Sequence, residues 1–266
     1  GNKRDIPLVD AGFTGNEVDT AQAATLNQFI DFVQNHYMPQ NIICVVIDRM
    51  VRPLWCLARD ETSNSTMAIH DFANAITNKN IPVLVIDAPM KSMIEVAYEL
   101  RKQKTGVQYF IASQGQVQSK GFDYTVMLQN IAQCISSSPQ NMECAIAQSI
   151  CNGNSYPLLE QPDVRSLVLT DMQQFENAMG YMSQVISECE TAYTTNPLLI
   201  DSARFDSHFF YPIPWYVDWV EFLQTTGIQQ IQDAITGFQD CVIAKVMPAN
   251  NEHPGLGIMF STKTHE

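Results

Sequence analysis

Basic residues are scarce in this sequence, and the shortage excludes several kinds of partner. The 266 residues include 15 Lys and Arg against 28 Asp and Glu, which gives a formal net charge of −13. Nucleic acids and anionic membranes are bound through cationic surfaces, so neither is expected as the main partner. A basic peptide or protein is compatible with the charge of the chain.

Long apolar runs and ordered cysteine motifs are also missing. The sequence contains no run of ~18 apolar residues, so no transmembrane segment is predicted. The first residues, "GNKR", lack the apolar core of a signal peptide. The seven cysteines are odd in number and include no CxxC pair, which disfavours a zinc site and a disulfide framework alike. Most of them lie in apolar segments and are expected to be small buried side chains.

Apolar residues, by contrast, are plentiful and occur in short runs. Hydrophobic residues make up 45% of the sequence and charged residues 16%, a composition typical of a folded protein with a large core. Five near-continuous apolar runs predict strands that are buried on both faces of a mostly parallel sheet. These runs are 41–48, 82–87, 107–113, 164–171 and 255–261.

Segments with apolar residues at helical spacing lie between and after these runs. They cover 26–33, 69–76, 93–100, 128–135, 175–186 and 228–242. We expect Asp19 or Thr20 to cap the first helix, and 196–216 to form a long, partly packed connection. Alternating strands and helices predict a three-layer α/β/α sandwich with right-handed crossovers.

Two of the predicted strands end in Ile-Asp, in "VVIDRMV" with Asp48 and in "VLVIDAPM" with Asp87. In an open parallel sheet, ligands bind beyond the carboxyl ends of the strands. If the two strands are neighbours, Arg49, Asp87 and Pro89 would surround one crevice. The residue at the second junction is a proline, which has no reactive group.

A longer match continues from the second junction. "DAPMKSMIEVAYELR" followed by "YFIASQGQVQSKGFDY" resembles the clostripain family of cysteine peptidases, which have a caspase-like fold. The family's pattern is an Asp-Ala-Cys-Leu-Met junction, a helix with Glu-Val-Ala-Tyr-Glu-Leu, and a Ser-Gln-Glu turn leading to Gly-Trp-Asp-Tyr. "ARDETSNSTMAIHDFANAI", "YVDWVEFL" and "HPGLGIMFS" are similar to further family segments. The resemblance implies one caspase-like domain over residues 1–266, which begins after the family's first strands.

The departures from the family pattern fall on its catalytic residues. The nucleophilic cysteine corresponds to Pro89 and the catalytic histidine to Arg49; an alternative alignment places the histidine at Leu57 but spoils the match at 60–63. Proline has no side-chain heteroatom, and arginine stays protonated and cannot act as a base. Loss of a nucleophile alone reduces turnover on the order of 10⁶-fold. The resemblance therefore implies an inactive peptidase-like protein that binds a peptide or protein partner.

Several residues at the junctions have more than one interpretation. The resemblance implies that Asp87 helps to form a pocket for basic residues, whereas helix geometry favours an N-cap. Pro89 suits the first turn of a helix. Arg49 is interpreted as a partner of Asp87 or as a surface residue. Asp48 ends the neighbouring strand, and the family fold implies that the turn after the third strand, Ser113 and Gln114, lines the same crevice.

Two further functions compete with partner binding. One is a hydrolase that uses a relocated pair, Cys56 with His70, although His70 is expected at the surface of its helix. The other is a purely structural scaffold. No cofactor is predicted. Some members of the family respond to calcium, and the acidic turn at Asp60 and Glu61 is compatible with calcium binding. The resemblance also implies a bacterial, exported protein, whose signal or anchor lies outside this chain.

Overall fold

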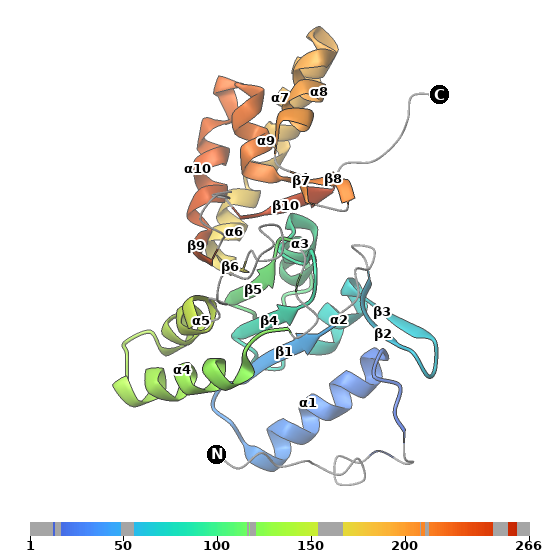
Figure 1. The fold of residues 1–266 in the computed structure, drawn as a ribbon, viewed down its shortest axis with the longest axis vertical. Helices are drawn as coiled ribbons and strands as arrows, with labels where there is room; N and C mark the ends of the chain where they lie inside the picture. The colour runs from blue at the N-terminus through green and yellow to red at the C-terminus, as the bar shows by residue number, and fades with distance from the viewer. Residues whose placement is uncertain are drawn as a thin grey trace.

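The computed structural model describes residues 13, 17–48, 56–115, 117, 121–153, 167–207, 209–210, 213–246 and 255–259. A central sheet with helices on both faces forms one part of the molecule, and a group of C-terminal helices with a small sheet forms the other (Figure 1).

The central sheet has five strands in the order β1-β4-β5-β6-β9. They are β1 (Ile43–Ile47), β4 (Val83–Asp87), β5 (Tyr109–Ser113), β6 (Leu167–Asp171) and β9 (Val242–Val246). β1, β4 and β5 are parallel, whereas β6 is antiparallel to both of its neighbours. Four strands therefore run in one direction, and the predicted α/β class with a mostly parallel sheet is confirmed.

Every residue of β4 and β5 is buried, because helices cover both faces of the sheet. One layer contains α1 (Ala23–Tyr37), α2 (Ile69–Ile76) and α3 (Ile94–Lys102), and the other contains α4 (Tyr124–Ser137) and α5 (Met142–Gly153). Successive side chains of a strand point to opposite faces. Accordingly, Leu84 and Ile86 belong to the core under the first layer, and Val83 and Val85 to the core under the second.

Two smaller sheets and further helices complete the fold. The hairpin of β2 (Cys56–Asp60) and β3 (Ser65–Ala68) precedes α2. The C-terminal helices are α6 (Met172–Met179), α7 (Met182–Thr195), α8 (Pro197–Asp206), α9 (Trp219–Thr226) and α10 (Gln232–Asp240). A three-stranded sheet is formed by β10 (Gly257–Met259), β8 (Ile213–Asp218) and β7 (Phe209–Phe210).

Five predictions about elements are wrong. The single helix predicted over 175–186 is two helices, because α6 ends at Met179 and α7 begins at Met182. Val242 does not continue the helix over 228–242 but begins β9, because the helix ends at Asp240. The strand predicted at 255–261 is found as β10, which pairs with β8 and not with the central sheet. The segment 196–216 contains α8, with Pro197 in its first turn, followed by β7 and most of β8.

The fifth wrong prediction is the cap of the first helix. α1 begins at Ala23 with Gln22 as its N-cap residue. Asp19 instead accepts a hydrogen bond from the backbone N–H of Ala21 at 3.0 Å, and Thr20 is bound to Asp60.

Among the helices that the structure describes, none is long and apolar enough to cross a membrane.

Candidate functional site

The two Ile-Asp junctions meet at one edge of the sheet, as predicted. β1 and β4 are neighbours with Ile47 opposite Asp87, and the backbone N–H of Asp48 donates to the carbonyl of Asp87 at 3.2 Å. Both side chains are buried. Arg49 lies outside the described residues, so its pairing with Asp87 stays a prediction.

The Asp87 carboxylate is held inside the protein. Its side chain is fully buried, and Oδ2 accepts hydrogen bonds from the backbone N–H of Phe122 at 3.1 Å and from the hydroxyl of Tyr124. The N-cap interpretation is wrong, since α3 begins after Met93 and no side chain caps it. A basic group that approached Asp87 would compete with the Tyr124 hydroxyl for Oδ2.

Pro89 is buried in the turn that follows β4. The first-turn interpretation is wrong, because α3 starts only at Ile94. After the proline, Met90 adopts a left-handed backbone with φ 55° and donates its N–H to the carbonyl of Gly115 at 2.9 Å. The turn is thus anchored across the end of β5, and it places an apolar ring at the position where the resemblance implies a nucleophile.

Ser113 and Gln114 lie in the same region, but their side chains bond within the protein. Both are buried. Ser113 Oγ donates to the carbonyl of Gly115 at 3.2 Å, and Gln114 Nε2 donates to Asp218 Oδ2 at 2.6 Å. Their role in binding a substrate stays a prediction. The Gln114–Asp218 bond joins the end of β5 to the start of α9.

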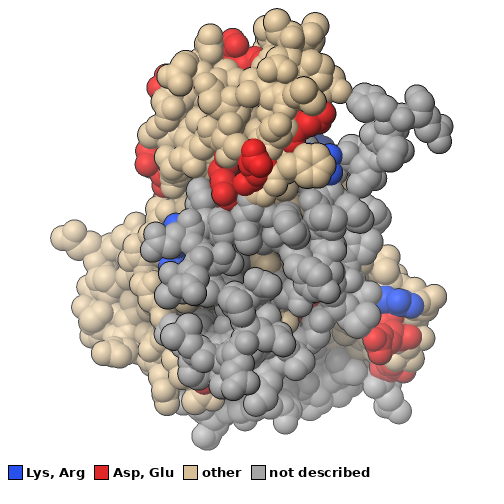
Figure 2. Space-filling model, turned by 45° about the horizontal axis from the view of Figure 1, so that its top comes forward, with Lys and Arg blue, Asp and Glu red and all other residues tan. Residues whose placement is uncertain are grey.

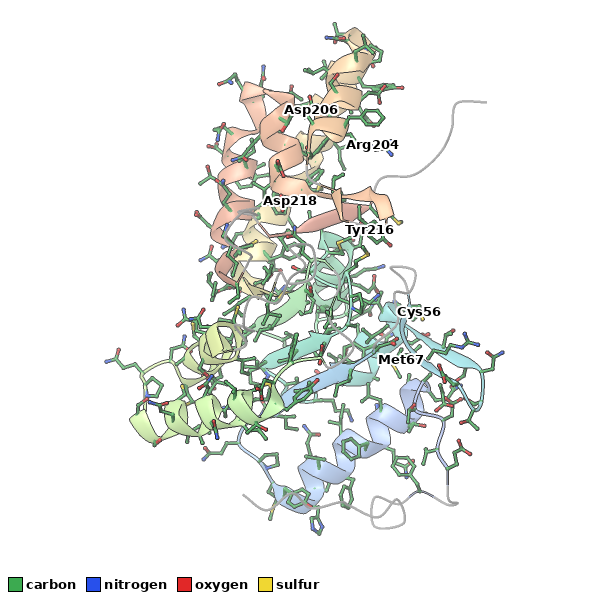
Figure 3. The ribbon with its side chains drawn as sticks, in the orientation of Figure 1. Cys56, Met67, Arg204, Asp206, Tyr216 and Asp218 are labelled. Carbon is green, nitrogen blue, oxygen red and sulfur yellow. The ribbon has the colours of Figure 1, made fainter. Side chains whose placement is uncertain are left out.

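Asp218 is a buried carboxylate that the sequence analysis missed. It caps α9 by accepting from the N–H of Glu221 at 2.9 Å, and Oδ2 also accepts from the N–H of Gly255 at 2.9 Å. Burial raises the pKa of Asp218, although these hydrogen bonds oppose the rise. Figure 3 shows Asp218 at the junction of β8 and α9. The sequence signal that could have identified this cap is an aspartate directly before the apolar helix "WVEFL".

Cys56 and His70 do not form a catalytic pair in the structure. Cys56 is buried, and its Sγ donates to the carbonyl of Ala58 at 3.5 Å. His70 is exposed, as predicted, with Nδ1 2.6 Å from a carboxylate oxygen of Glu99 and Nε2 2.9 Å from the side-chain amide of Asn74. Each side chain is therefore engaged with other groups.

Three other thiols are unsuited to nucleophilic attack. Burial raises the pKa of Cys44 to about 11, and raises the pKa of both Cys151 and Cys241 to about 12. The thiolate is the reactive form of cysteine. These three residues are therefore protonated at neutral pH. Cys151 and Cys241 fill space in the core, whereas Cys44 is partly buried against it. Three of the seven cysteines are buried and four are partly exposed, so the prediction that most are buried is wrong.

The acidic turn at Asp60 is organised by hydrogen bonds. Oδ1 accepts from the N–H groups of Thr62 and Ser63 at 3.0 Å, and Oδ2 accepts from the N–H and hydroxyl of Thr20 at 3.0 and 2.9 Å. The N–H of Ser63, followed by the two donors of Thr20, holds the pKa of Asp60 well below its usual range. No group of three or more His, Cys, Asp or Glu that could hold a metal ion occurs within the described part of the chain.

The sheet order, the two helical layers and the adjoining ends of β1 and β4 define a caspase-like α/β protein. The chain belongs to the Clostripain family, the C11 peptidases, whose sequence pattern matches residues 2–252. No curated protein matches the sequence closely.

Solved structures of C11 proteases share the fold. An inactive zymogen C11 protease from Parabacteroides distasonis is 20% identical, with a TM-score of 0.68, and the match covers 94% of this chain and 72% of that one. A secreted C11 cysteine protease from Bacteroides thetaiotaomicron, iotapain, is 16% identical with a TM-score of 0.67, over 90% of this chain and 72% of that one.

Proposed function

We propose that this chain is a clostripain-family protein without peptidase activity, and that it acts by binding a peptide or protein partner. The observation that carries the proposal is Pro89, which follows Asp87 and Ala88 at the carboxyl end of β4. The family resemblance places the nucleophilic cysteine at this position. The proposal treats residues 1–266 as one domain.

The chemistry of the two replacements supports loss of catalysis. A cysteine peptidase needs a thiolate and a neighbouring base that accepts its proton. The proline ring offers no lone pair that could attack a carbonyl carbon. Arg49, at the position that corresponds to the histidine in the sequence, is permanently protonated and cannot take up a proton. Both steps of the peptidase reaction therefore lack their reacting group.

The charge of the chain supports a basic partner. Between Met172 and Asp240 the sequence contains one Lys or Arg, Arg204. Exposed carboxylates lie on α7, α8 and α10 in the same span: Glu190, Asp201, Asp206, Asp233 and Asp240. In Figure 2, Asp and Glu side chains outnumber Lys and Arg over the upper part of the face shown. A cationic segment would be attracted to this surface.

An exported location is part of the proposal. It is supported by the description of the related iotapain as secreted. Fractionation of the producing cells with an antibody against the chain tests it, and recovery of the protein only with the cytosolic fraction would contradict export.

The experiment for loss of catalysis combines two readouts. The purified protein is incubated with peptides that contain Arg and Lys and, separately, with a thiol-directed covalent probe, alongside the Cys56→Ala variant. We expect no peptide turnover by either protein and no labelling of the wild type that depends on Cys56. Turnover by the wild type that disappears in the Cys56→Ala variant would overturn the proposal in favour of a hydrolase with a relocated nucleophile.

A further inference from the structure

The helices α7 and α8 form a hairpin at one end of the molecule. Only Asn196 separates them in the sequence, and they pack against each other and, through α8, against α9. Figure 1 shows this hairpin at the end opposite α1 and β1. The structure describes residues 167–207 without a gap. The two sides of α8 can therefore be compared residue by residue.

Two large apolar side chains lie on the outer side of α8. Phe205 is 80% exposed and Leu198 is 71% exposed. They are seven residues apart, so they lie on the same side of the helix, about 10 Å from each other along its axis. The core side of the helix has its own apolar residues, the buried Ala203 and the partly buried Ile200. Because one apolar side already faces the core, the second one is available for contact with another molecule.

Acidic side chains surround this apolar surface. Asp201 lies between the two apolar residues on the outer side of α8, since it is within one turn of each of them. Asp206 follows at the end of the helix, and Glu190 lies on the neighbouring α7; all three carboxylates belong to exposed residues. The outer side of α8 thus combines apolar and negatively charged groups, which suits an occupant that is apolar and basic.

The charge of this part of the chain decides between two occupants. Residues 172–240 include nine Asp and Glu and one Lys or Arg, which is Arg204. Its Cζ lies 5.9 Å from the centroid of the Phe205 ring, and Figure 3 shows it on α8 together with Asp206. A second copy of the chain would bring its own acidic helices against these carboxylates, and like charges oppose association. A basic partner gains from the same charges.

We propose that the outer side of α8 binds a basic amphipathic helix of another protein. The apolar side of that helix packs on Leu198 and Phe205, and Lys or Arg residues beside it pair with Asp201, Asp206 and Glu190. Seven-residue spacing of apolar groups is the spacing at which one helix packs along another, and an amphipathic helix recognised by its apolar side is a common mode of peptide binding. The inference rests on the proposed function, because it gives the partner its chemistry and its site.

The test uses a fluorescent peptide of Leu and Lys with the leucines at helical spacing, and a second peptide of the same composition in scrambled order. Anisotropy is measured on addition of the full chain. We expect saturable binding of the helical peptide and affinity about tenfold lower for the scrambled one. The double variant Leu198→Ser/Phe205→Ser is expected to bind the helical peptide at least about tenfold more weakly. Ile135→Ser, at a residue of α4 that is 51% exposed, is the matched control and should bind as the wild type does.

A charge variant tests the acidic part of the site. Asp201→Asn keeps the shape of the side chain and removes its charge, so it should weaken binding about threefold and make binding less sensitive to salt. The substituted residues are exposed, and circular dichroism with urea denaturation checks that each variant folds as the wild type does. An affinity and a salt dependence unchanged by Asp201→Asn would contradict the pairing with this carboxylate.

The outcomes separate this inference from the proposed function. Equal affinity in the double variant and in Ile135→Ser would overturn the α8 site and leave binding of a basic partner in place. Absence of saturable binding by the folded wild type would overturn the inference as well. Sedimentation that shows a wild-type dimer dissociated by the double variant would assign the surface to a second copy and contradict the proposal. Cleavage of the peptide, seen by mass spectrometry, would instead contradict the loss of catalysis.

Discussion

Single residues in this protein show three ways of burying a carboxylate. Asp218 accepts hydrogen bonds from Gln114 and from two backbone N–H groups. Asp87 accepts from Phe122 and Tyr124. Glu95, in the first turn of α3, accepts from the N–H of Met259 at 2.9 Å through Oε1, whereas its buried Oε2 has no hydrogen-bond partner among the described residues. The effect of removing a charge or a donor should therefore differ among them.

Tyr124→Phe tests whether the protein depends on the closed Asp87 site. The substitution removes the hydroxyl donor to a fully buried carboxylate, and is expected to lower the free energy of unfolding by about 1–3 kcal/mol. Urea denaturation measures the change. Tyr98→Phe, at a tyrosine that is 46% exposed, is the control and should change stability little. Equal stability of the wild type and Tyr124→Phe would show that the hydroxyl does not support Asp87.

Glu95→Gln gives a prediction with a defined pH dependence. Burial raises the pKa of Glu95 in the folded protein, with the Met259 N–H opposing the rise. The folded state therefore binds the proton more tightly than the unfolded state, and the stability that this adds below the unfolded pKa is lost as pH rises through the folded pKa. Glutamine does not titrate. The stability of Glu95→Gln relative to the wild type should increase from about pH 4 to about pH 7.

Denaturation of both proteins across that pH range checks the Glu95 prediction. Glu190→Gln, at an exposed position on α7, serves as the control. A stability difference between Glu95→Gln and the wild type that stays constant with pH, or falls as pH rises, would contradict the prediction.

At the scale of elements, helix caps depend only on residues a few positions apart in the sequence. Asp171 ends β6 and caps α6, with Oδ1 accepting from the N–H groups of Gln173 and Gln174 at 2.9 and 3.0 Å. Asp171→Ala removes the acceptor and is expected to destabilise the protein by about 1 kcal/mol. Asp171→Asn retains a capping oxygen and should recover most of the loss in thermal or urea unfolding. Loss of the same size in both variants would mean that the cap is not the cause.

The fully buried strands could be predicted from the sequence, whereas α8 and β9 could not. β4 and β5 are apolar except for Asp87 and Ser113 at their ends, a pattern that fits no surface helix. β9 was missed because only Cys241 separates it from α10, so the apolar pattern continues without a turn signal. α8 was missed because its proline and neighbouring aromatics are typical of a connection, although proline suits a helical first turn.

Some features of the candidate site could also be predicted from the sequence, and others could not. The meeting of Asp48 and Asp87 follows from two parallel strands in one sheet, and the sequence predicted it. The closure of Asp87 by Phe122 and Tyr124 joins residues 35 and 37 positions apart, which no local pattern indicates. The cap at Asp218 had a sequence signal, but its bond to Gln114 spans 104 positions and depends on the tertiary fold.

At the scale of the whole molecule, a peptidase-family fold is combined with a junction that has no reactive side chain. The family match covers residues 2–252. The turn at Pro89 is held by backbone hydrogen bonds from Met90, Lys91 and Ser92 to the end of β5. These bonds do not involve the side chain at position 89, so the turn can form without a cysteine there.

Restoring one catalytic residue should not restore activity. Pro89→Cys supplies a sulfur at the junction but no histidine to take its proton, so we expect turnover of Arg and Lys peptides to stay at the level of buffer. Fluorogenic peptide hydrolysis measures this, with circular dichroism as the control for folding. Rapid turnover by the single variant would show that another group in the crevice acts as the base.

Hydrolysis by the unmodified protein tests the central claim most directly. Purified protein is incubated with a library of peptides that contain Arg and Lys, and new termini are counted by mass spectrometry against a buffer control and a sample treated with a thiol-blocking reagent. The account predicts the same products in all three samples. Cleavage after basic residues by the untreated protein, abolished by the thiol-blocking reagent, would contradict it.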